Sequence, residues 1–147
     1  MKAILLLCTV SAVLTCGVAA VDGDTIRISV DAIAVSIRLY GIDCPETDKA
    51  YGEEAAAFTQ KLLDAGALDG RIIATDRYRR VIMIVEAGGK CINEELVAAG
   101  LAWVEPRYCT RAECETWKAL ESEARLEGRG LWADVDPVPP WTYRKIH

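Results

Sequence analysis

The chain has 147 residues, 52% of them hydrophobic and 27% charged, with a formal net charge of −5. This length suits one domain with a real core and is too short for two, and the composition excludes extensive disorder. The acidic balance argues against tight nonspecific binding of duplex nucleic acid, because affinity for a polyanion normally comes from lysine and arginine.

The N-terminal segment has the layout of a secretory signal peptide, with one lysine, an apolar run and then small residues. We expect a signal over residues 1–12, with cleavage as late as residue 20 as an alternative, and a single domain over residues 13–147. The apolar stretch is too short to span a membrane, because Asp22 interrupts it. The expected location is secreted or periplasmic. A lipid anchor at Cys16 and a cytoplasmic location, with a buried strand in place of the signal, are the alternatives.

Two cysteines agree with an oxidising compartment. Cys109 and Cys114 flank the short loop CTRAEC, which in such a compartment predicts a local disulfide. Structural zinc is a weaker interpretation, because a lone C-x4-C supplies too few ligands. His147 is the sole histidine of the sequence, so histidine-based triads and catalytic zinc sites lack their usual component. The chemistry is then left to carboxylates, arginines and a metal ion.

Alternating apolar and polar residues predict two strands, 25–30 and 33–40, joined by a tight turn into a β-hairpin. Arg38 lies on one face of the second strand. The opposite, apolar face carries Ile33, Val35, Ile37 and Leu39.

Three helices are expected further along the chain. The first covers 51–66, and the second covers 93–100 with Asn93 as its N-cap. The third covers 113–128, burying Trp117, Leu120 and Ala124 and leaving an acidic, solvated face that includes Glu121. Strand patterns lie at 71–76, 81–87 and 101–105, and Gly88 and Gly89 form a turn after the second of them. The proline-rich tail is expected to pack through Trp141 and Tyr143.

About five strands with a helix between the third and fourth favour a small closed barrel over a sandwich. The expected fold class is therefore mainly β with helices (α+β), a five-stranded OB-type barrel with about three α-helices. Barrels of this type bind phosphate-bearing chains on one face.

Four acidic residues lie where the hairpin begins and ends. Asp22 and Asp24 precede its first strand, while Asp43 and Glu46 follow its second. A hairpin returns its ends to one edge, so these carboxylates can converge, and an acidic cluster of oxygen donors suits Ca²⁺ or Mg²⁺. The alternative is that the aspartates only form a turn and the glutamate is a solvated loop residue.

Two arginines flank the same region. Arg38 enters the loop from its strand and Arg80 follows the DRY tripeptide, so both guanidinium groups can grip a phosphate bidentately. A metal ion, a carboxylate base and paired arginines suffice for phosphodiester hydrolysis. The alternative is a structural network in which these arginines pair with Asp43 and Glu46.

Six stretches occur in an order that resembles the thermonuclease family, the staphylococcal nuclease-like domains. They are VDGDTIRI, IRLYGIDCPE, YGEEAAAFTQKLL, DRYRR, GKCINEELVAAGLAWV and LESEARLEGRGLW. The resemblance as a whole runs from about residue 13 to 132. The resemblance implies an OB-type five-stranded barrel with three helices. It also implies hydrolysis of DNA and RNA phosphodiester bonds with one Ca²⁺.

The resemblance also implies roles for the acidic residues. Asp24 and Asp43 match the two metal-binding aspartates, and the carbonyl of Cys44 matches a backbone ligand. Asp22 matches a nearby acid that supports the site without binding the ion. Glu46 matches the glutamate assigned as general base for the attacking water.

The basic and aromatic positions match as well. Arg38 and Arg80 match the two arginines that neutralise the phosphate in the transition state. Tyr78 and Tyr108 are similar to positions that line the nucleotide pocket, and Arg77 is expected to contribute to substrate binding beside them.

The chain departs from the family pattern in the DRYRR stretch, where Arg79 replaces a glycine, and at Pro106, which replaces a second pocket tyrosine. If that glycine needs positive φ, the loop that holds Arg80 has to reshape. The expected function is a Ca²⁺-dependent, monomeric nuclease acting on single-stranded or denatured DNA or on RNA. A noncatalytic nuclease-like module that binds nucleic acid or protein is the alternative.

Overall fold

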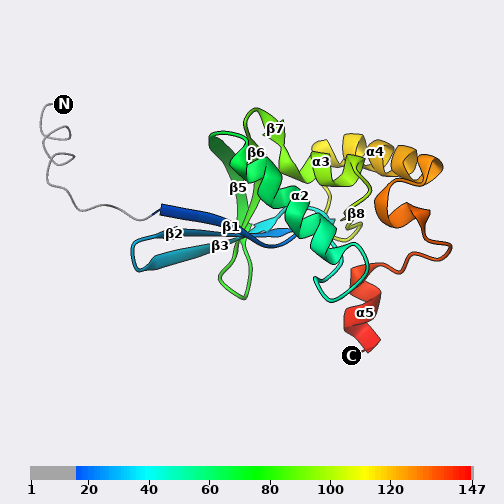
Figure 1. Cartoon of the computed structure of the whole chain (residues 1–147), viewed down its shortest axis with the longest axis horizontal. Helices are drawn as coiled ribbons and strands as arrows, with labels where there is room; N and C mark the ends of the chain where they lie inside the picture. The colour runs from blue at the N-terminus through cyan, green and yellow to red at the C-terminus, as the bar shows by residue number, and fades with distance from the viewer. Residues whose placement is uncertain (1–15, 147) are drawn as a thin grey trace, which may run out of the picture.

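A computed structural model describes residues 16–146, so the expected signal over residues 1–12 lies outside the described residues. The described part has a mixed α+β fold, as the sequence predicts (Figure 1). The strands are β1 (Cys16–Asp22), β2 (Thr25–Val30), β3 (Ile33–Leu39), β4 (Ile42–Asp43), β5 (Leu68–Thr75), β6 (Val81–Ala87), β7 (Lys90–Cys91) and β8 (Trp103–Val104). The helices are α2 (Gly52–Asp64), α3 (Ile92–Ala98), α4 (Glu113–Glu127), the 3-10 helix η1 (Gly130–Ala133) and α5 (Pro140–Ile146).

One sheet has the order β1-β2-β3-β6-β5, with β7 paired to β6, and a separate pair joins β4 to β8. The strands pair antiparallel except for β3 and β6, which are parallel. Pairing between β1 and β5 is not found within residues 16–146, so closure of the expected barrel stays a prediction. The predicted hairpin is confirmed, and β1 adds a third strand to it.

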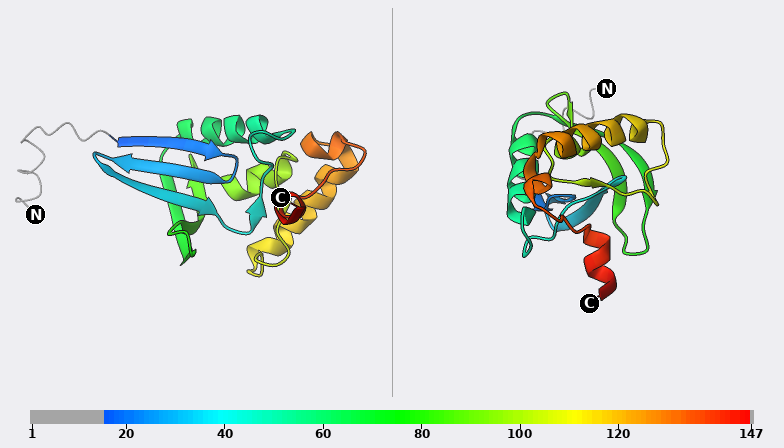
Figure 2. Two further views of the ribbon diagram at one scale, coloured as in Figure 1. Left: turned by 90° about the horizontal axis from the view of Figure 1, so that it is seen from below. Right: turned by 90° about the vertical axis from the view of Figure 1, so that its right-hand side faces the viewer.

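The hairpin extends beyond the core (Figure 2). Ile37 and Leu39 are 5% and 1% exposed, as their predicted apolar face requires. Ile33 and Val35 lie on the same face of β3 but are 71% and 42% exposed. The alternation therefore identified the face correctly, but within residues 16–146 the core does not extend to the tip of the hairpin.

Helices cover the sheet and close one end of the molecule. The helix α2 packs on β1, and α3 packs between β6 and α4. Trp117 of α4 is 1% exposed and packs near Tyr40, with 6.3 Å between ring centroids. These contacts form one core, to which β3 and β6 contribute the buried ends of their apolar faces.

Asn93 is not the N-cap of α3 that its local sequence suggests. Cys91 occupies the cap position, and Asn93 lies inside the helix with none of its surface exposed. Its side-chain oxygen accepts a hydrogen bond from the Val85 N–H at 3.1 Å, and its amide donates to the Tyr40 carbonyl at 2.9 Å. Asn93 therefore joins α3 to β6 and to the residue that follows β3, because the buried backbone groups there need partners.

The acidic face of α4 is only partly solvated. The Glu121 side chain is 13% exposed and accepts a hydrogen bond from the backbone N–H of Val104 at 2.5 Å. It also pairs with Arg125 at 2.5 Å. The expectation of a solvated glutamate was wrong, because β8 ends beside α4 with a backbone N–H that requires an acceptor.

The C-terminal tail forms a helix that packs on the domain. Trp103 contacts Trp132 and Trp141 edge to face, with centroids 4.2 Å and 5.8 Å apart. This confirms the expected packing of Trp141, although the tail is helical and so adds a fourth α-helix to the three expected within the described residues. The helix α5 projects from the same side of the molecule as the β5–β6 loop (Figures 1 and 2).

No helix within residues 16–146 has both the length and the apolar character that crossing a membrane would require.

Candidate active site

The turn between β1 and β2 fixes the first two aspartates. Asp22 accepts a hydrogen bond from the backbone N–H of Asp24 at 3.1 Å, which closes a turn of the Asx type. A Cβ on Gly23 would lie 2.7 Å from the Cβ of Ala55, so only glycine allows this close approach to α2. The Gly23 carbonyl accepts a hydrogen bond from the buried Thr59 hydroxyl at 2.6 Å. The turn is therefore clamped to α2, which fixes the position of the carboxylate that follows.

Asp24 is 2% exposed and is held from two sides. Its Oδ2 accepts a hydrogen bond from the backbone N–H of Cys44 at 2.7 Å, and its Oδ1 pairs with Nη1 of Arg38. The register of the hairpin explains the second contact, because Thr25 of β2 lies opposite Arg38 of β3. The residue before Thr25 is therefore adjacent to the guanidinium.

Arg38 bridges two buried carboxylates. Its Nη2 lies 3.0 Å from Oδ1 of Asp43, which is also 2% exposed. Burial disfavours the charged guanidinium, but Asp24 and Asp43 outweigh this effect and raise the pKa of Arg38 above its ordinary value. The guanidinium is therefore a permanent cation shared by the two acids.

Burial raises the pKa of Asp24 well above its ordinary value. The charge of Arg38 acts in the opposite sense, while the carboxylates of Asp22 and Asp43 add to the rise. Burial also raises the pKa of the Cys44 thiol, which keeps that side chain neutral. A further positive charge, in addition to that of Arg38, would therefore stabilise the ionised carboxylates of this site.

A second guanidinium reaches Asp43, and no pattern in the sequence indicated it. Nη2 of Arg144, in α5, lies 2.5 Å from Oδ1 and 2.6 Å from Oδ2 of Asp43. Its Nε lies 3.5 Å from Oε1 of Glu46, whose side chain is 49% exposed. Asp43 thus lies between two arginines, one from β3 and one from the C-terminal helix.

Glu46 belongs to the loop between β4 and α2. The first residue of α2, Gly52, approaches the Glu46 carbonyl so closely that any Cβ would collide with it. A pocket of about 110 Å³ opens beside this glutamate, and Lys49, Trp103 and Tyr143 are among its lining residues. The C-terminal segment therefore forms one wall of the space next to Glu46.

The ligand types suit a hard divalent cation, because Asp24 and Asp43 offer carboxylate oxygens beside the Cys44 backbone. The oxygens are nevertheless engaged by arginines. Within residues 16–146 no group of three or more His, Cys, Asp and Glu side chains is arranged to hold a metal ion. The roles of these residues as ligands stay predictions.

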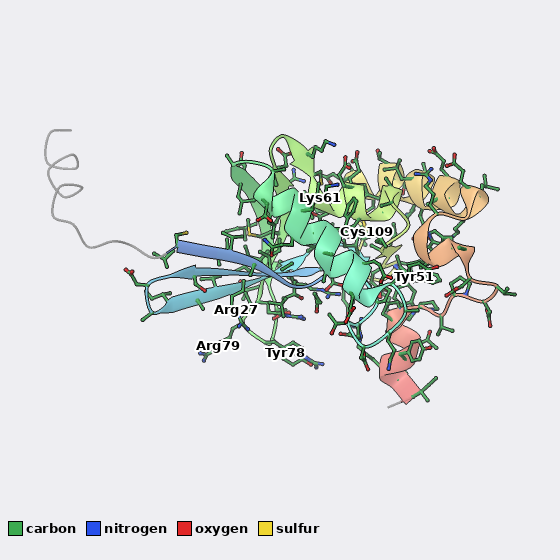
Figure 3. All side chains as sticks on the ribbon, in the orientation of Figure 1. Arg27, Tyr51, Lys61, Tyr78, Arg79 and Cys109 are labelled. Carbon is green, nitrogen blue, oxygen red and sulfur yellow. A yellow bond between two sulfur atoms is a disulfide. The ribbon has the colours of Figure 1, made fainter. Side chains whose placement is uncertain are left out.

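The β5–β6 loop carries the second predicted arginine. Asp76 accepts hydrogen bonds from the Arg80 side chain at 2.7 Å and from the backbone N–H groups of Tyr78 and Arg80 at 2.8 Å and 3.0 Å. Arg77 donates to the Tyr78 hydroxyl at 2.7 Å, and this tyrosine is 64% exposed at the loop end (Figure 3). These hydrogen bonds to Asp76 fix the conformation of the loop. The Arg80 side chain contacts Asp76 and Tyr78 and is not brought together with Arg38, Asp24 and Asp43.

Arg79 has φ of 63°, in the left-handed region that favours glycine. The loop therefore keeps the backbone that a glycine would adopt and places an arginine in it, so it does not reshape as the replacement suggested. Its side chain projects from the loop end near Tyr78 (Figure 3). The cost of this conformation is about 1–2 kcal/mol for a residue with a Cβ.

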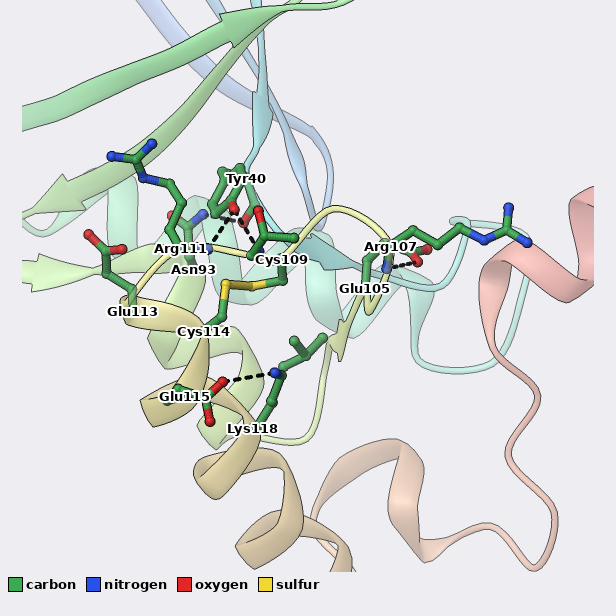
Figure 4. The surroundings of a disulfide bond; sticks show 12 residues. Tyr40, Asn93, Glu105, Arg107, Cys109, Arg111, Glu113, Cys114, Glu115 and Lys118 are labelled. Carbon is green, nitrogen blue, oxygen red and sulfur yellow. Dashed lines mark hydrogen bonds and ion pairs between the residues drawn. A yellow bond between two sulfur atoms is a disulfide. The ribbon is translucent and has the colours of Figure 1, made fainter.

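The predicted disulfide between Cys109 and Cys114 is present and buried (Figure 4). Beside it, the Tyr40 hydroxyl accepts hydrogen bonds from the backbone N–H groups of Thr110 and Arg111, at 2.9 Å and 3.2 Å. These contacts tie the CTRAEC loop to the end of β3. Tyr108 precedes the disulfide and is 69% exposed, so its ring is accessible to a ligand.

Comparisons with known proteins identify the family of the chain. A family model described as "Staphylococcal nuclease homologue" matches residues 36–134. An Escherichia coli protein named "Uncharacterized endonuclease" is 40% identical over 124 residues, covering 84% of this chain and 79% of that protein. "Protein ParB" of Escherichia coli is 36% identical over 139 residues, covering 85% and 75%. "Staphylococcal-like nuclease CAN1" of Arabidopsis thaliana is 39% identical over 109 residues, covering 74% and 33%.

The chain therefore belongs to the staphylococcal nuclease homologue family, as its sequence motifs predicted. The fold of that family is the OB fold, in agreement with the mixed sheet and helices described above.

Proposed function

We propose that the chain is a Ca²⁺-dependent nuclease that hydrolyses phosphodiester bonds of DNA, of RNA or of both. The observation that carries the proposal is the pair of buried aspartates, Asp24 and Asp43, bridged by Arg38 in a member of this family. The relatives named as an endonuclease and as a staphylococcal-like nuclease support the same reaction class.

In this proposal Asp24, Asp43 and the carbonyl of Cys44 hold the ion. A bound Ca²⁺ would polarise the phosphate and offset its negative charge. Asp22 contributes indirectly, because its hydrogen bond shapes the turn that presents Asp24.

Glu46 acts as the general base for the attacking water. Its half-exposed side chain supports this role, because water reaches the carboxylate and the adjacent pocket leaves space for it. Arg38 and Arg80 stabilise the phosphate as charge builds in the transition state. Arg80 would act from the β5–β6 loop, where Asp76 fixes the base of the loop.

The proposed substrate is single-stranded or denatured DNA, or RNA, bound by a monomer. Arg77, Tyr78 and Tyr108 contribute to substrate binding, and the exposure of both tyrosine rings supports this role. A formal charge of −5 disfavours tight binding of long duplexes, so the affinity depends on local arginines.

We also propose that the chain is exported, with residues 1–12 as the signal. The disulfide between Cys109 and Cys114 supports an oxidising compartment. Cleavage after residue 12 leaves β1 whole, whereas cleavage after residue 20 would remove most of that strand.

Cleavage of denatured DNA tests the function, in Ca²⁺ and in excess chelator. Glu46→Gln and Arg80→Ala should each lower the rate by about a hundredfold or more. Glu53→Gln is the matched control, because Glu53 is an exposed acid in the first turn of α2, and its rate should stay near that of the unmodified chain. A protein that binds Ca²⁺ and leaves the DNA intact would favour the noncatalytic module.

A further inference from the structure

We propose that Arg144 competes with the divalent cation for Asp43, so that α5 lowers the affinity of the site for that cation. The inference rests on the proposed cation site at Asp24 and Asp43. It adds a residue of the C-terminal helix to that site and gives it an opposing role.

Guanidinium groups contact both carboxylate oxygens of Asp43. Nη2 of Arg144 lies 2.5 Å and 2.6 Å from the two oxygens, and Arg38 lies 3.0 Å from Oδ1. The Asp43 side chain is 3% exposed, so a ligand reaches it only by taking the place of one of these groups. A guanidinium and a divalent cation repel each other at such distances. Arg144 contacts both oxygens, whereas Arg38 contacts only Oδ1, so Arg144 occupies the position that a cation on this carboxylate would take.

Arg144 is the more replaceable of the two arginines. Its side chain is 49% exposed, whereas that of Arg38 is 18% exposed and bridges Asp24 as well as Asp43. Water screens the ion pair of a half-exposed guanidinium and makes it weak, whereas breaking a buried pair leaves an uncompensated charge, so Arg144 is released at a lower cost than Arg38. Arrival of a cation therefore displaces Arg144 and leaves Arg38 in place.

The position of Arg144 is built into the fold. Trp141 packs edge to face against Trp103 at 5.8 Å between centroids, and Pro140 is buried at the start of α5. Lys49 lies 5.7 Å above the Tyr143 ring, which joins α5 to the loop that carries Glu46. Because a docked helix presents the guanidinium, its local concentration at Asp43 is high and the competition is intramolecular.

Calorimetric titration of the full chain with Ca²⁺, without nucleic acid, tests the proposal. If Arg144 occupies Asp43 for about nine-tenths of the time, its removal should tighten Ca²⁺ binding about tenfold, because only the open fraction binds. Arg144→Gln is the test variant. Lys145→Gln is the matched control, since it removes the same charge from the next residue, whose side chain has no hydrogen bond or ion pair within residues 16–146.

The expected result is Ca²⁺ binding about fivefold to tenfold tighter in Arg144→Gln and changed less than twofold in Lys145→Gln. Equal effects of the two substitutions would reduce the role of Arg144 to general repulsion and overturn the proposal. Unchanged or weaker binding in Arg144→Gln would also overturn it. Tighter binding in Arg144→Gln without any cleavage of DNA by the unmodified chain would instead reject the proposed nuclease function alone.

Discussion

Replacing Arg38 with methionine removes the cation that Asp24 and Asp43 share. Methionine is unbranched and keeps much of the apolar volume of the arginine stem, so the loss of charge is the main change. The two carboxylates are each 2% exposed, and Asp24 would be left with the Cys44 N–H and other neutral donors. Asp43 would keep Arg144. We therefore expect the loss to fall mainly on Asp24.

Removing one partner of a buried ion pair costs about 3–5 kcal/mol. The lower end applies here, because the Arg38 side chain is 18% exposed and Asp43 retains a second arginine. We expect a loss of about 3 kcal/mol in the free energy of unfolding at neutral pH. For a domain of this size that corresponds to a fall in Tm of about 10 °C.

The pH dependence separates this explanation from a simple packing defect. The pKa of Asp24 is already raised by burial, and loss of Arg38 raises it further. A carboxyl whose folded pKa lies above its unfolded value stabilises the fold while it is protonated, and that stability is lost as pH rises through the folded pKa. The gap between the unmodified chain and Arg38→Met should therefore narrow as pH falls.

Urea unfolding followed by tryptophan fluorescence measures this gap, at neutral pH and at about pH 5, in the presence of a chelator. Arg27→Met is the matched control, because Arg27 lies exposed on the adjacent strand β2 (Figure 3). Adding Asp24→Asn to Arg38→Met should recover part of the loss, since the unpaired charge is gone. The reasoning would be refuted if Arg38→Met were no less stable than Arg27→Met, or if acidification widened the gap.

Substitutions at three further places test the local structure. In thermal unfolding, Arg79→Gly should raise the free energy of unfolding by about 0.5–1 kcal/mol, because glycine adopts a left-handed backbone without strain. Arg79→Val should lower the free energy of unfolding in the same measurement. Thr59→Val should cost about 1–3 kcal/mol in urea unfolding by leaving the Gly23 carbonyl unpaired, and Thr59→Ser should cost less; equal losses would exclude the hydrogen bond as the cause. Replacing Cys109 and Cys114 by serine opens a loop with a sequence separation of 5 and should cost about 2 kcal/mol, a difference that should vanish when the unmodified chain is reduced.

The hairpin and its acids were predictable because they depend on short-range geometry. Strand alternation and a tight turn imply that Thr25 and Arg38 lie opposite each other, as the register shows. Asp24 directly precedes that pair, so its contact with Arg38 follows from the same pattern. Alternation gives the face of a strand but not how far the core extends, which is why Ile33 and Val35 proved exposed.

Contacts made by long-range packing were not predictable. Arg144 is 101 positions from Asp43 in the sequence, and nothing near either residue indicates the pairing. Asn93 has the local sequence of a helix cap, yet its side chain pairs with backbone groups that only the tertiary fold brings near. In both cases a buried polar group, the Asp43 carboxylate or the Asn93 amide, finds its partner in a distant element. Single-sequence periodicity contains no information about such partners.

The two arginines at Asp43 differ in a way that relates the stability of the fold to its proposed chemistry. Burying two negatively charged carboxylates side by side is costly, so the fold needs a positive charge next to Asp24 and Asp43 whether or not a metal ion is bound. Arg38 meets that need permanently from β3, and its bridge to Asp24 makes it expensive to remove. Arg144, whose side chain is half-exposed on α5, supplies further positive charge to Asp43 and can be displaced from it. Arg38 therefore stabilises the buried acids when no cation is bound, whereas Arg144 occupies the position at Asp43 that the cation would take.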